Sequence, residues 1–262
     1  MQTDFIGKNA LVGGSSKGIG RAIAEALARA GANITLLARN RESLEAVLQG
    51  LDTSKGQQHD YILADFSQPQ TLSDALAAYA QKYPQKPFHI LINNTGGPAG
   101  GKLVGTLPDA FRAAFEMHLV CNQILANWAI PSMRAEKFGR IINVISTSVK
   151  QPLENLGVSN TIRGAVANWA KTLATELAPF GITVNNLLPG ATRTDRLEAI
   201  LKNKSAQTGK SIQEISTEML AEIPAGRFAE PEEIAQAAVF LASAGYVNGI
   251  NLPVDGGRTK SL

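Results

Sequence analysis

Short apolar runs alternate along this chain with longer segments in which apolar positions recur every three or four residues. Ile23, Leu27 and Ala30, for example, fall on one face of a helix. Strands that alternate with helices form right-handed βαβ units, so the pattern predicts one doubly wound α/β domain, with a parallel sheet of about seven strands and helices on both faces. The strands are expected at residues 10–12, 34–37, 61–63, 89–92, 141–145, 182–188 and 250–254.

Three helical segments stand out from this alternation. Long helices are expected near residues 108–136 and 156–179, where small and apolar side chains recur. The polar segment 195–225 interrupts the path from the sixth strand to the last, and we interpret it as a helical lid. No repeat, linker or low-complexity segment divides residues 1–262, so a single domain is expected.

Composition narrows the class of protein. The chain has 262 residues, of which 44% are hydrophobic, and this is enough for one substantial core. The net charge of +3 is not gathered into a block of lysine or arginine, which argues against a nucleic-acid partner. The single cysteine, Cys121, excludes an internal disulfide, and its apolar helical surroundings favour an inert packing thiol over a reactive one.

The expected location of the protein follows from two missing patterns. The N-terminal residues lack the basic and then apolar pattern of a secretory signal, and no apolar stretch reaches the length of a membrane span. We therefore expect a cytoplasmic protein with no membrane partner.

A glycine-rich segment lies between the first predicted strand and the first helix. Its key glycines are Gly14, Gly18 and Gly20, with Ser16 and Ile19 between them. Glycine permits a tight turn and lets backbone amides approach a pyrophosphate, while the following helix presents free N–H groups and its positive dipole end. The context of strand, turn and amphipathic helix favours a Rossmann-type dinucleotide site. The alternative is a glycine-rich turn that binds no ligand.

The end of the second predicted strand indicates which dinucleotide is bound. A carboxylate there would bond the 2′-hydroxyl of NAD, but Arg39 stands at the tip instead, and Lys17 lies in the glycine loop. Two cations that converge on the ribose suit a 2′-phosphate, so we expect NADP(H) rather than NAD(H). The alternative is that both side chains are solvated surface charges.

Together with four further motifs, this loop makes the chain resemble the short-chain dehydrogenase/reductase family, close to its 3-oxoacyl-carrier-protein reductase-like members. The loop resembles the family's Thr-Gly-x-x-x-Gly-x-Gly motif, with Gly13 in place of the threonine. The resemblance covers nearly the whole chain and implies a dinucleotide held at the carboxyl ends of the strands. The other motifs are Asp65 and Phe66; Asn93, Asn94, Thr95 and Gly96; Pro189 and Gly190 with Thr192 and Thr194; and residues 254–257.

The resemblance also implies a catalytic set of a serine, a tyrosine, a lysine four residues after the tyrosine, and a supporting asparagine. Ser146, at the end of the fifth predicted strand, matches the serine and is expected to donate a hydrogen bond to the substrate. Ser159 stands in the tyrosine position and Arg163 in the lysine position, on one helix face. His118 stands in the asparagine position. The chain is therefore identified as an atypical member that lacks the Tyr-x-x-x-Lys pair.

These replacements leave the proton donor open. A serine hydroxyl is a far weaker acid than a phenol, and arginine keeps its proton above about pH 12, so Arg163 is expected to hold the nicotinamide ribose or to stabilise an oxyanion. The candidates for the donor are His118, which is expected to titrate near neutral pH, Lys150, and bound water. The alternatives are a packed or surface histidine and a solvated lysine. Tyr246 could reach the site only through folding or from a neighbouring subunit.

The glycine-rich loop 96–102 follows the fourth predicted strand. It is expected either to bring a mobile backbone to the substrate mouth, where Lys102 would attract an acidic substrate, or to be only a flexible surface loop.

We therefore expect an NADP(H)-dependent oxidoreductase that acts on a carbonyl or alcohol of a small-molecule substrate with an altered proton donor. A 3-oxoacyl thioester is suggested by the resemblance alone, and no metal is expected. The alternative is a catalytically silent NADP(H)-binding sensor or partner subunit. The resemblance also implies a homodimer or homotetramer formed through the two long helices, whose apolar faces could instead be core.

Overall fold

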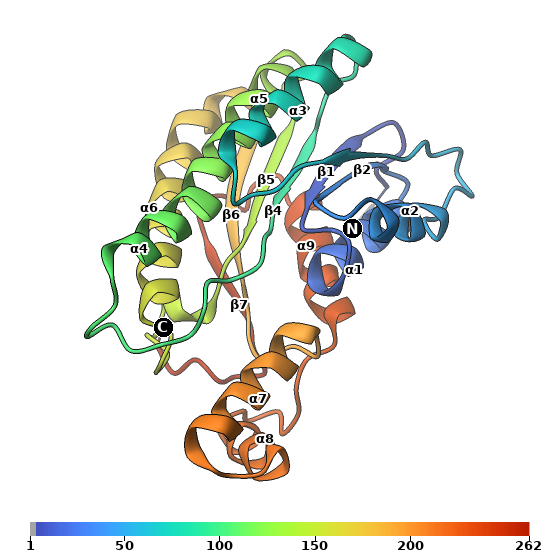
Figure 1. Ribbon diagram of the computed structural model, residues 1–262. Coiled ribbons are helices and arrows are strands. Elements are labelled where there is room, and N and C mark those ends of the chain that lie inside the picture. Colours follow the sequence, from blue (N-terminus) through green and yellow to red (C-terminus); the bar gives the residue numbers. More distant parts are fainter. Residues whose placement is uncertain (1–3, 262) are drawn as a thin grey trace.

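The structure, a computed structural model, describes residues 4–261 as a parallel sheet with helices on both faces (Figure 1). Its strands are β1 (Asn9–Gly13), β2 (Asn33–Ala38), β3 (Asp60–Leu63), β4 (Ile90–Asn93), β5 (Gly139–Val144), β6 (Ile182–Pro189) and β7 (Asn251–Val254). They lie in the order β3-β2-β1-β4-β5-β6-β7, and each neighbouring pair is parallel. The doubly wound fold predicted from the sequence is confirmed, with small shifts in the strand bounds.

Helices form two apolar layers against the sheet (Figure 1). One layer contains α1 (Gly18–Arg29), α2 (Arg41–Gln49) and α9 (Pro231–Ser243), and the other contains α3 (Pro69–Lys82), α5 (Cys121–Ala135) and α6 (Gly157–Leu177). Successive strand residues point to opposite faces, so Ile90 and Ile92 pack in the first layer and Leu91 in the second. Burial on both faces explains why the strands read as continuous apolar runs.

Four asparagine side chains form a ladder across β4, β5, β6 and β7. Asn93 Nδ2 donates to Asn143 Oδ1 at 2.8 Å, and Asn143 Nδ2 donates to Asn186 Oδ1 at 2.9 Å. Asn186 Nδ2 in turn donates to Asn251 Oδ1 at 2.8 Å. These residues are register partners in the sheet, and a slip of one residue would leave buried amides unpaired. The ladder therefore fixes the register of the four strands, and Asn93 and Asn143 lie at the carboxyl ends from which site loops leave.

The helix predicted for residues 108–136 is continuous but has a wider turn in its middle. It consists of α4 (Pro108–Phe115), the π turn η1 (Glu116–Val120) and α5. Such turns are frequent at functional sites, and the buried side chain of His118 lies in this one. The second long helix is α6. Two short 3₁₀ turns, η2 (Thr147–Val149) and η3 (Ala178–Phe180), follow β5 and α6.

The segment 195–225 forms α7 (Asp195–Thr208) and α8 (Ile212–Ala221), which lie beyond the carboxyl end of β6 (Figure 1). The two helices enclose an apolar cluster that is separate from the two layers on the sheet. Its members are Leu197, Leu201, Ile215, Met219, Ile223 and Phe228. Between residues 4 and 261, no helix combines the length and the apolar character that crossing a membrane requires.

Candidate active site

The carboxyl ends of the strands carry the loops that the sequence assigns to cofactor and substrate. The sheet is built outward from β1 in both directions, with β2 and β3 on one side and β4 to β7 on the other. Ligands of open parallel sheets bind outside the carboxyl ends at such a switch point. Here Asn94 Nδ2, just after β4, donates to the carbonyl of Gly13 in the glycine loop at 3.1 Å. The structure thus brings two of the predicted motifs together.

The shape of the glycine loop requires its glycines. Gly14 has a φ of +56°, in the left-handed region that other residues rarely adopt. Gly20 is restricted by space, since a Cβ there would lie 2.3 Å from the carbonyl oxygen of Gly14. Ser15, which the sequence analysis did not single out, is fully buried, and its Oγ accepts a hydrogen bond from Leu37 N at 2.9 Å. The loop is therefore fixed to β2 as well as to β4.

The amino end of α1 fits a phosphate group. Lys17 occupies its N-cap position without a side-chain cap, and the first turn contains no acidic residue. Ser16 is half-buried in the turn, and Ile19 packs against the layer of α1 and α9. Uncapped N–H groups and the positive end of the helix dipole are the features that bind phosphate. The residues present therefore fit the pyrophosphate of a dinucleotide.

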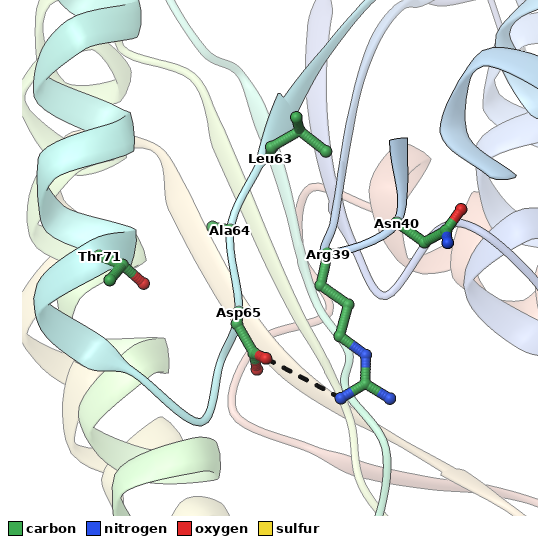
Figure 2. Close-up of a pocket in the computed structure, with 6 residues that line it drawn as sticks. All are labelled: Arg39, Asn40, Leu63, Ala64, Asp65 and Thr71. Carbon is green, nitrogen blue, oxygen red and sulfur yellow. Dashed lines mark ion pairs between the residues drawn. The ribbon is translucent and has the colours of Figure 1, made fainter. Parts of the chain in front are cut away.

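An open groove lies beyond the ends of β2 and β3 (Figure 2). It is lined by Arg39, Asn40, Leu63, Ala64, Asp65 and Thr71. Figure 2 shows Arg39 and Asp65 pointing toward each other, with Arg39 Nη1 3.9 Å from Asp65 Oδ2. Hydrogen bonds from the backbone and hydroxyl of Ser67 hold the pKa of the Asp65 carboxyl below its usual value, and Arg39 adds to this effect. The groove thus offers an exposed guanidinium and an ionised acceptor.

Lys17 and Phe66 lie elsewhere than the sequence suggested. Lys17 does not join Arg39 at the groove, because its Nζ lies 2.6 Å from Asp195 Oδ2 in the first turn of α7. The side chain of Phe66 is buried in the layer of α3 and α5, and its carbonyl accepts a hydrogen bond from Cys121 Sγ at 3.3 Å. Burial raises the pKa of the Cys121 thiol to about 12, as befits a packing thiol.

The loop from β6 to α7 lies against the glycine loop. A Cβ at Gly18 would be 3.2 Å from Thr194 Cγ2, and Thr192 Oγ1 donates to the carbonyl of Gly190 at 3.1 Å. Pro189 ends β6 and begins this loop. After β4, Thr95 is half-buried and Gly96 is exposed. The motif segments expected to bind a cofactor therefore gather along one edge of the sheet.

Ser146 begins the turn that follows β5. Its Oγ accepts a hydrogen bond from Ser148 N at 3.1 Å, which orients the side chain and still leaves the hydroxyl able to donate. Lys150 is half-buried at the end of the same turn, and its carbonyl accepts a hydrogen bond from Ser261 Oγ at 3.3 Å. The C-terminal segment therefore packs on the serine loop.

α6 carries Ser159 and Arg163, which are one turn apart. Ser159 is half-buried, whereas Arg163 is 8% exposed and its Nη1 donates to the carbonyl of Val144 at 2.8 Å. Burial lowers the pKa of Arg163 to about 10, and the charge of Arg196 adds to the shift. The guanidinium of Arg163 stays charged at neutral pH. It is held at the carbonyl of Val144, which precedes Ser146 by two residues in the sequence.

His118 does not titrate in the range expected from the sequence. Its ring is 2% exposed, and no hydrogen-bond partner of Nε2 exists among residues 4–261. Burial, and to a lesser extent the charge of Arg163, lower its pKa to about 2. The imidazole is therefore neutral at physiological pH and does not serve as an acid there. Its interaction with Arg163 nevertheless places it beside the predicted catalytic pair.

The tyrosines lie away from Ser146. Tyr246 is fully exposed in the segment before β7, at the amino ends of the strands, so folding does not bring it to the site of its own chain. The ring of Tyr79 packs at a tilted angle against the rings of Tyr83 and Phe88. The hydroxyl of Tyr61, in β3, donates to Glu45 on α2.

Arg196 is a site residue that the sequence analysis missed. It lies in the first turn of α7, and its Nη2 donates to the carbonyl of Pro98 at 2.8 Å. The Nη2 atoms of Arg196 and Arg163 lie 3.5 and 3.7 Å from the position that a Cβ of Gly97 would take. Its position two residues after Thr194, in a loop expected to face the cofactor, is the signal that could have singled it out.

Comparisons with known proteins agree with this arrangement. The family described as enoyl-(acyl carrier protein) reductase matches residues 14–259. The 3-oxoacyl-[acyl-carrier-protein] reductase FabG of Vibrio cholerae is 34% identical over 256 residues, which is 96% of this chain and 97% of that protein. The NADPH-dependent reductase BacG of Bacillus subtilis is 31% identical over 258 residues, which is 97% of this chain and 99% of that protein.

A solved structure extends the likeness to the whole fold. L-sorbose reductase from Gluconobacter frateurii, complexed with NADPH and L-sorbose, superimposes with a TM-score of 0.91 at 32% identity, and both chains are covered completely. BacG is described as NADPH-dependent and the sorbose reductase structure contains NADPH, which is the cofactor expected here from the sequence. The chain therefore belongs to the short-chain dehydrogenase/reductase family of oxidoreductases.

Proposed function

We propose that this protein is an NADP(H)-dependent oxidoreductase that interconverts a carbonyl and an alcohol on a small molecule, without a phenolic proton donor. The observation that carries the proposal is that the segments expected to bind the cofactor and the charged side chain of Arg163 lie at the same carboxyl ends of the strands, near Ser146. The glycine loop, the uncapped end of α1 and the β6–α7 loop all face the same edge of the sheet. Arg163 is anchored to Val144 at that edge.

The preference for NADP(H) rests on Arg39. Its exposed guanidinium lines the groove beyond β2, where a carboxylate would have bonded a ribose hydroxyl. A guanidinium binds the oxygens of a phosphate with a planar fork of donors. The NADPH dependence of BacG and the NADPH in the sorbose reductase structure support the same cofactor.

The residues of the chain then divide the remaining work. When bound, the cofactor supplies or accepts a hydride. Ser146 donates a hydrogen bond to the substrate oxygen, as its free hydroxyl proton allows. The buried charge of Arg163 stabilises negative charge that develops on this oxygen, since a fixed charge in a desolvated site acts strongly there.

The proton for the alcohol comes from water in this proposal. Ser159 is too weak an acid, and Arg163 keeps its proton at neutral pH even with its lowered pKa. His118 is already neutral, with a pKa of about 2. In this proposal a single water molecule protonates the oxygen that Ser146 and Arg163 stabilise and leaves as hydroxide, so the chain needs no acid of its own.

The test is NADPH oxidation with a panel of aldehydes, ketones and oxo acids. At least one member should be reduced, and Ser146→Ala should lower kcat/KM by about 100-fold, as expected when one oxyanion donor is removed. Ser54→Ala, on an exposed turn, is the matched control and should leave the rate unchanged. Tight NADPH binding with no turnover on the panel would instead support a silent sensor or partner subunit.

A further inference from the structure

Two arginines from distant parts of the chain face one point in the substrate half of the site. Arg163 comes from α6 and Arg196 from the first turn of α7. Their Nη2 atoms both lie within 4 Å of the place where a side chain of Gly97 would begin. Gly97 has no side chain, so only its backbone lies against the two guanidiniums, with which a Cβ would make ordinary van der Waals contact.

The guanidinium of Arg163, which lies close to Gly97, has a buried donor without a hydrogen-bond partner among the described residues. Its Nη1 is used by the carbonyl of Val144, but Nε is buried without a hydrogen-bond partner among residues 4–261. Nη2 faces Gly97. Nε and Nη2 form the side edge of a guanidinium, which matches the two oxygens of a carboxylate. The side chain is 8% exposed, so its donors have little water to satisfy them.

Neither arginine has an acidic partner within the described part of the chain. The carboxylate nearest in sequence to Arg196, that of Asp195, is paired with Lys17 at 2.6 Å. Arg196 is instead held by the carbonyl of Pro98. The charge of Arg196 disfavours the charged form of Arg163, because like charges repel strongly where water is scarce. A buried charge without a counterion is unfavourable, and an anion placed between the two would relieve it.

We propose that a carboxylate of the substrate binds next to Gly97, held by the unpaired edge of Arg163 and by Arg196. The inference rests on the proposed function, and it names the substrate as a small oxo acid or hydroxy acid whose reacting oxygen lies near its carboxylate. Two positive charges against one carboxylate leave one charge unmatched. That remaining positive charge stabilises the negative charge that develops on the reacting oxygen at Ser146.

The same contact assigns a role to α7. Arg196 bridges from this helix to the loop at Pro98, and α7 belongs to the helical unit with its own apolar cluster. A carboxylate that binds both arginines joins α6 to α7 across the site. Substrate binding then holds the segment 195–225 over the site, which is how this segment acts as a lid.

Calorimetry with succinate and its neutral analogue succinamide, on protein saturated with NADP⁺, tests the site without requiring turnover. Succinate should bind and succinamide should not. Arg196→Met should weaken succinate binding by about 10-fold or more, since one charge-assisted contact is lost, and should change NADP⁺ affinity by less than about twofold. Equal binding of the two probes, or no binding of succinate, would overturn the proposal. So would a parallel loss of NADP⁺ and succinate affinity in Arg196→Met, which would assign the arginines to a cofactor phosphate.

A substitution at Gly97 offers a second measurement. Its backbone is outside the left-handed region, and a Cβ there would make only ordinary contacts of 3.5 to 3.8 Å. Gly97→Asp should place a tethered carboxylate between the arginines, abolish succinate binding and raise the melting temperature above that of Gly97→Asn. Identical behaviour of the two variants would count against the site. If succinate binds as expected while the carbonyl panel shows no turnover, the proposed function fails and the anion site stands.

Discussion

The cofactor half and the substrate half of this site are built in different ways. In the cofactor half, the backbone shapes the glycine loop and the amino end of α1, and only the groove at Arg39 depends on an exposed side chain. In the substrate half, which comprises Ser146, His118, Arg163 and Arg196, long or buried side chains from four segments converge. Steric space determines which residues the glycine loop accepts. In the substrate half, the dominant feature is buried positive charge without an acidic partner among the described residues. The glycine loop therefore has no room for an added atom at Gly20, whereas we propose that a ligand completes the substrate half.

The strongest effect is expected when one methyl group is added to the glycine loop of the cofactor half. In Gly20→Ala the new Cβ would meet the Gly14 carbonyl at 2.3 Å, so the loop must shift. NADPH affinity should fall by about 100-fold because the backbone no longer fits the pyrophosphate. Fluorescence titration of NADPH measures this effect. Gly50→Ala, where a Cβ makes an ordinary contact of 3.6 Å, is the control, and equal losses in both variants would contradict the steric explanation.

The second prediction tests the protonation state of His118 in the substrate half through the pH dependence of the free energy of unfolding. His118 is neutral in the folded protein, with a pKa of about 2, but takes up a proton below about pH 6.5 when unfolded. Its contribution to the free energy of unfolding is therefore full above pH 6.5 and is lost as the pH falls. Between pH 6 and pH 4 this loss should be roughly 2 to 3 kcal/mol.

His118→Gln should remove this part of the pH dependence. Urea unfolding of both proteins at pH 6, 5 and 4 measures it, and the other histidines cancel in the comparison. An identical pH slope in the two proteins would show that His118 is protonated when folded. In that case the acid role rejected above would return.

The smallest expected effect concerns the exposed cation of the cofactor half. Arg39→Ala should weaken NADPH binding by about 10-fold and leave NADH binding unchanged, because only NADPH carries the 2′-phosphate. Arg41→Ala is the matched control, since this neighbouring arginine is engaged by Tyr61 and Glu45. Equal losses of NADPH and NADH affinity in Arg39→Ala would remove the phosphate role.

The two halves were also unequally visible in the sequence. The cofactor loop could be recognised from Gly14, Gly18 and Gly20, because a backbone constraint is local in sequence and only glycine satisfies it. Arg163 was found through its spacing from Ser159, but its burial and free edge were not. Lys17 was assigned to the ribose, although a residue of α7 holds it in the structure. A long surface side chain such as that of Lys17 can pair with a residue that is distant in sequence, so its local sequence does not indicate its partner.

The alternation of apolar runs and helical periods by itself determined the seven strands and the two helical layers, because burial on both faces leaves a direct trace in the sequence. Only the tertiary structure decided that His118 is neutral, that Lys17 turns to Asp195, and that Arg196 meets Arg163. Charge and protonation depend on desolvation and on neighbours that are distant along the chain, and these exist only once the chain has folded.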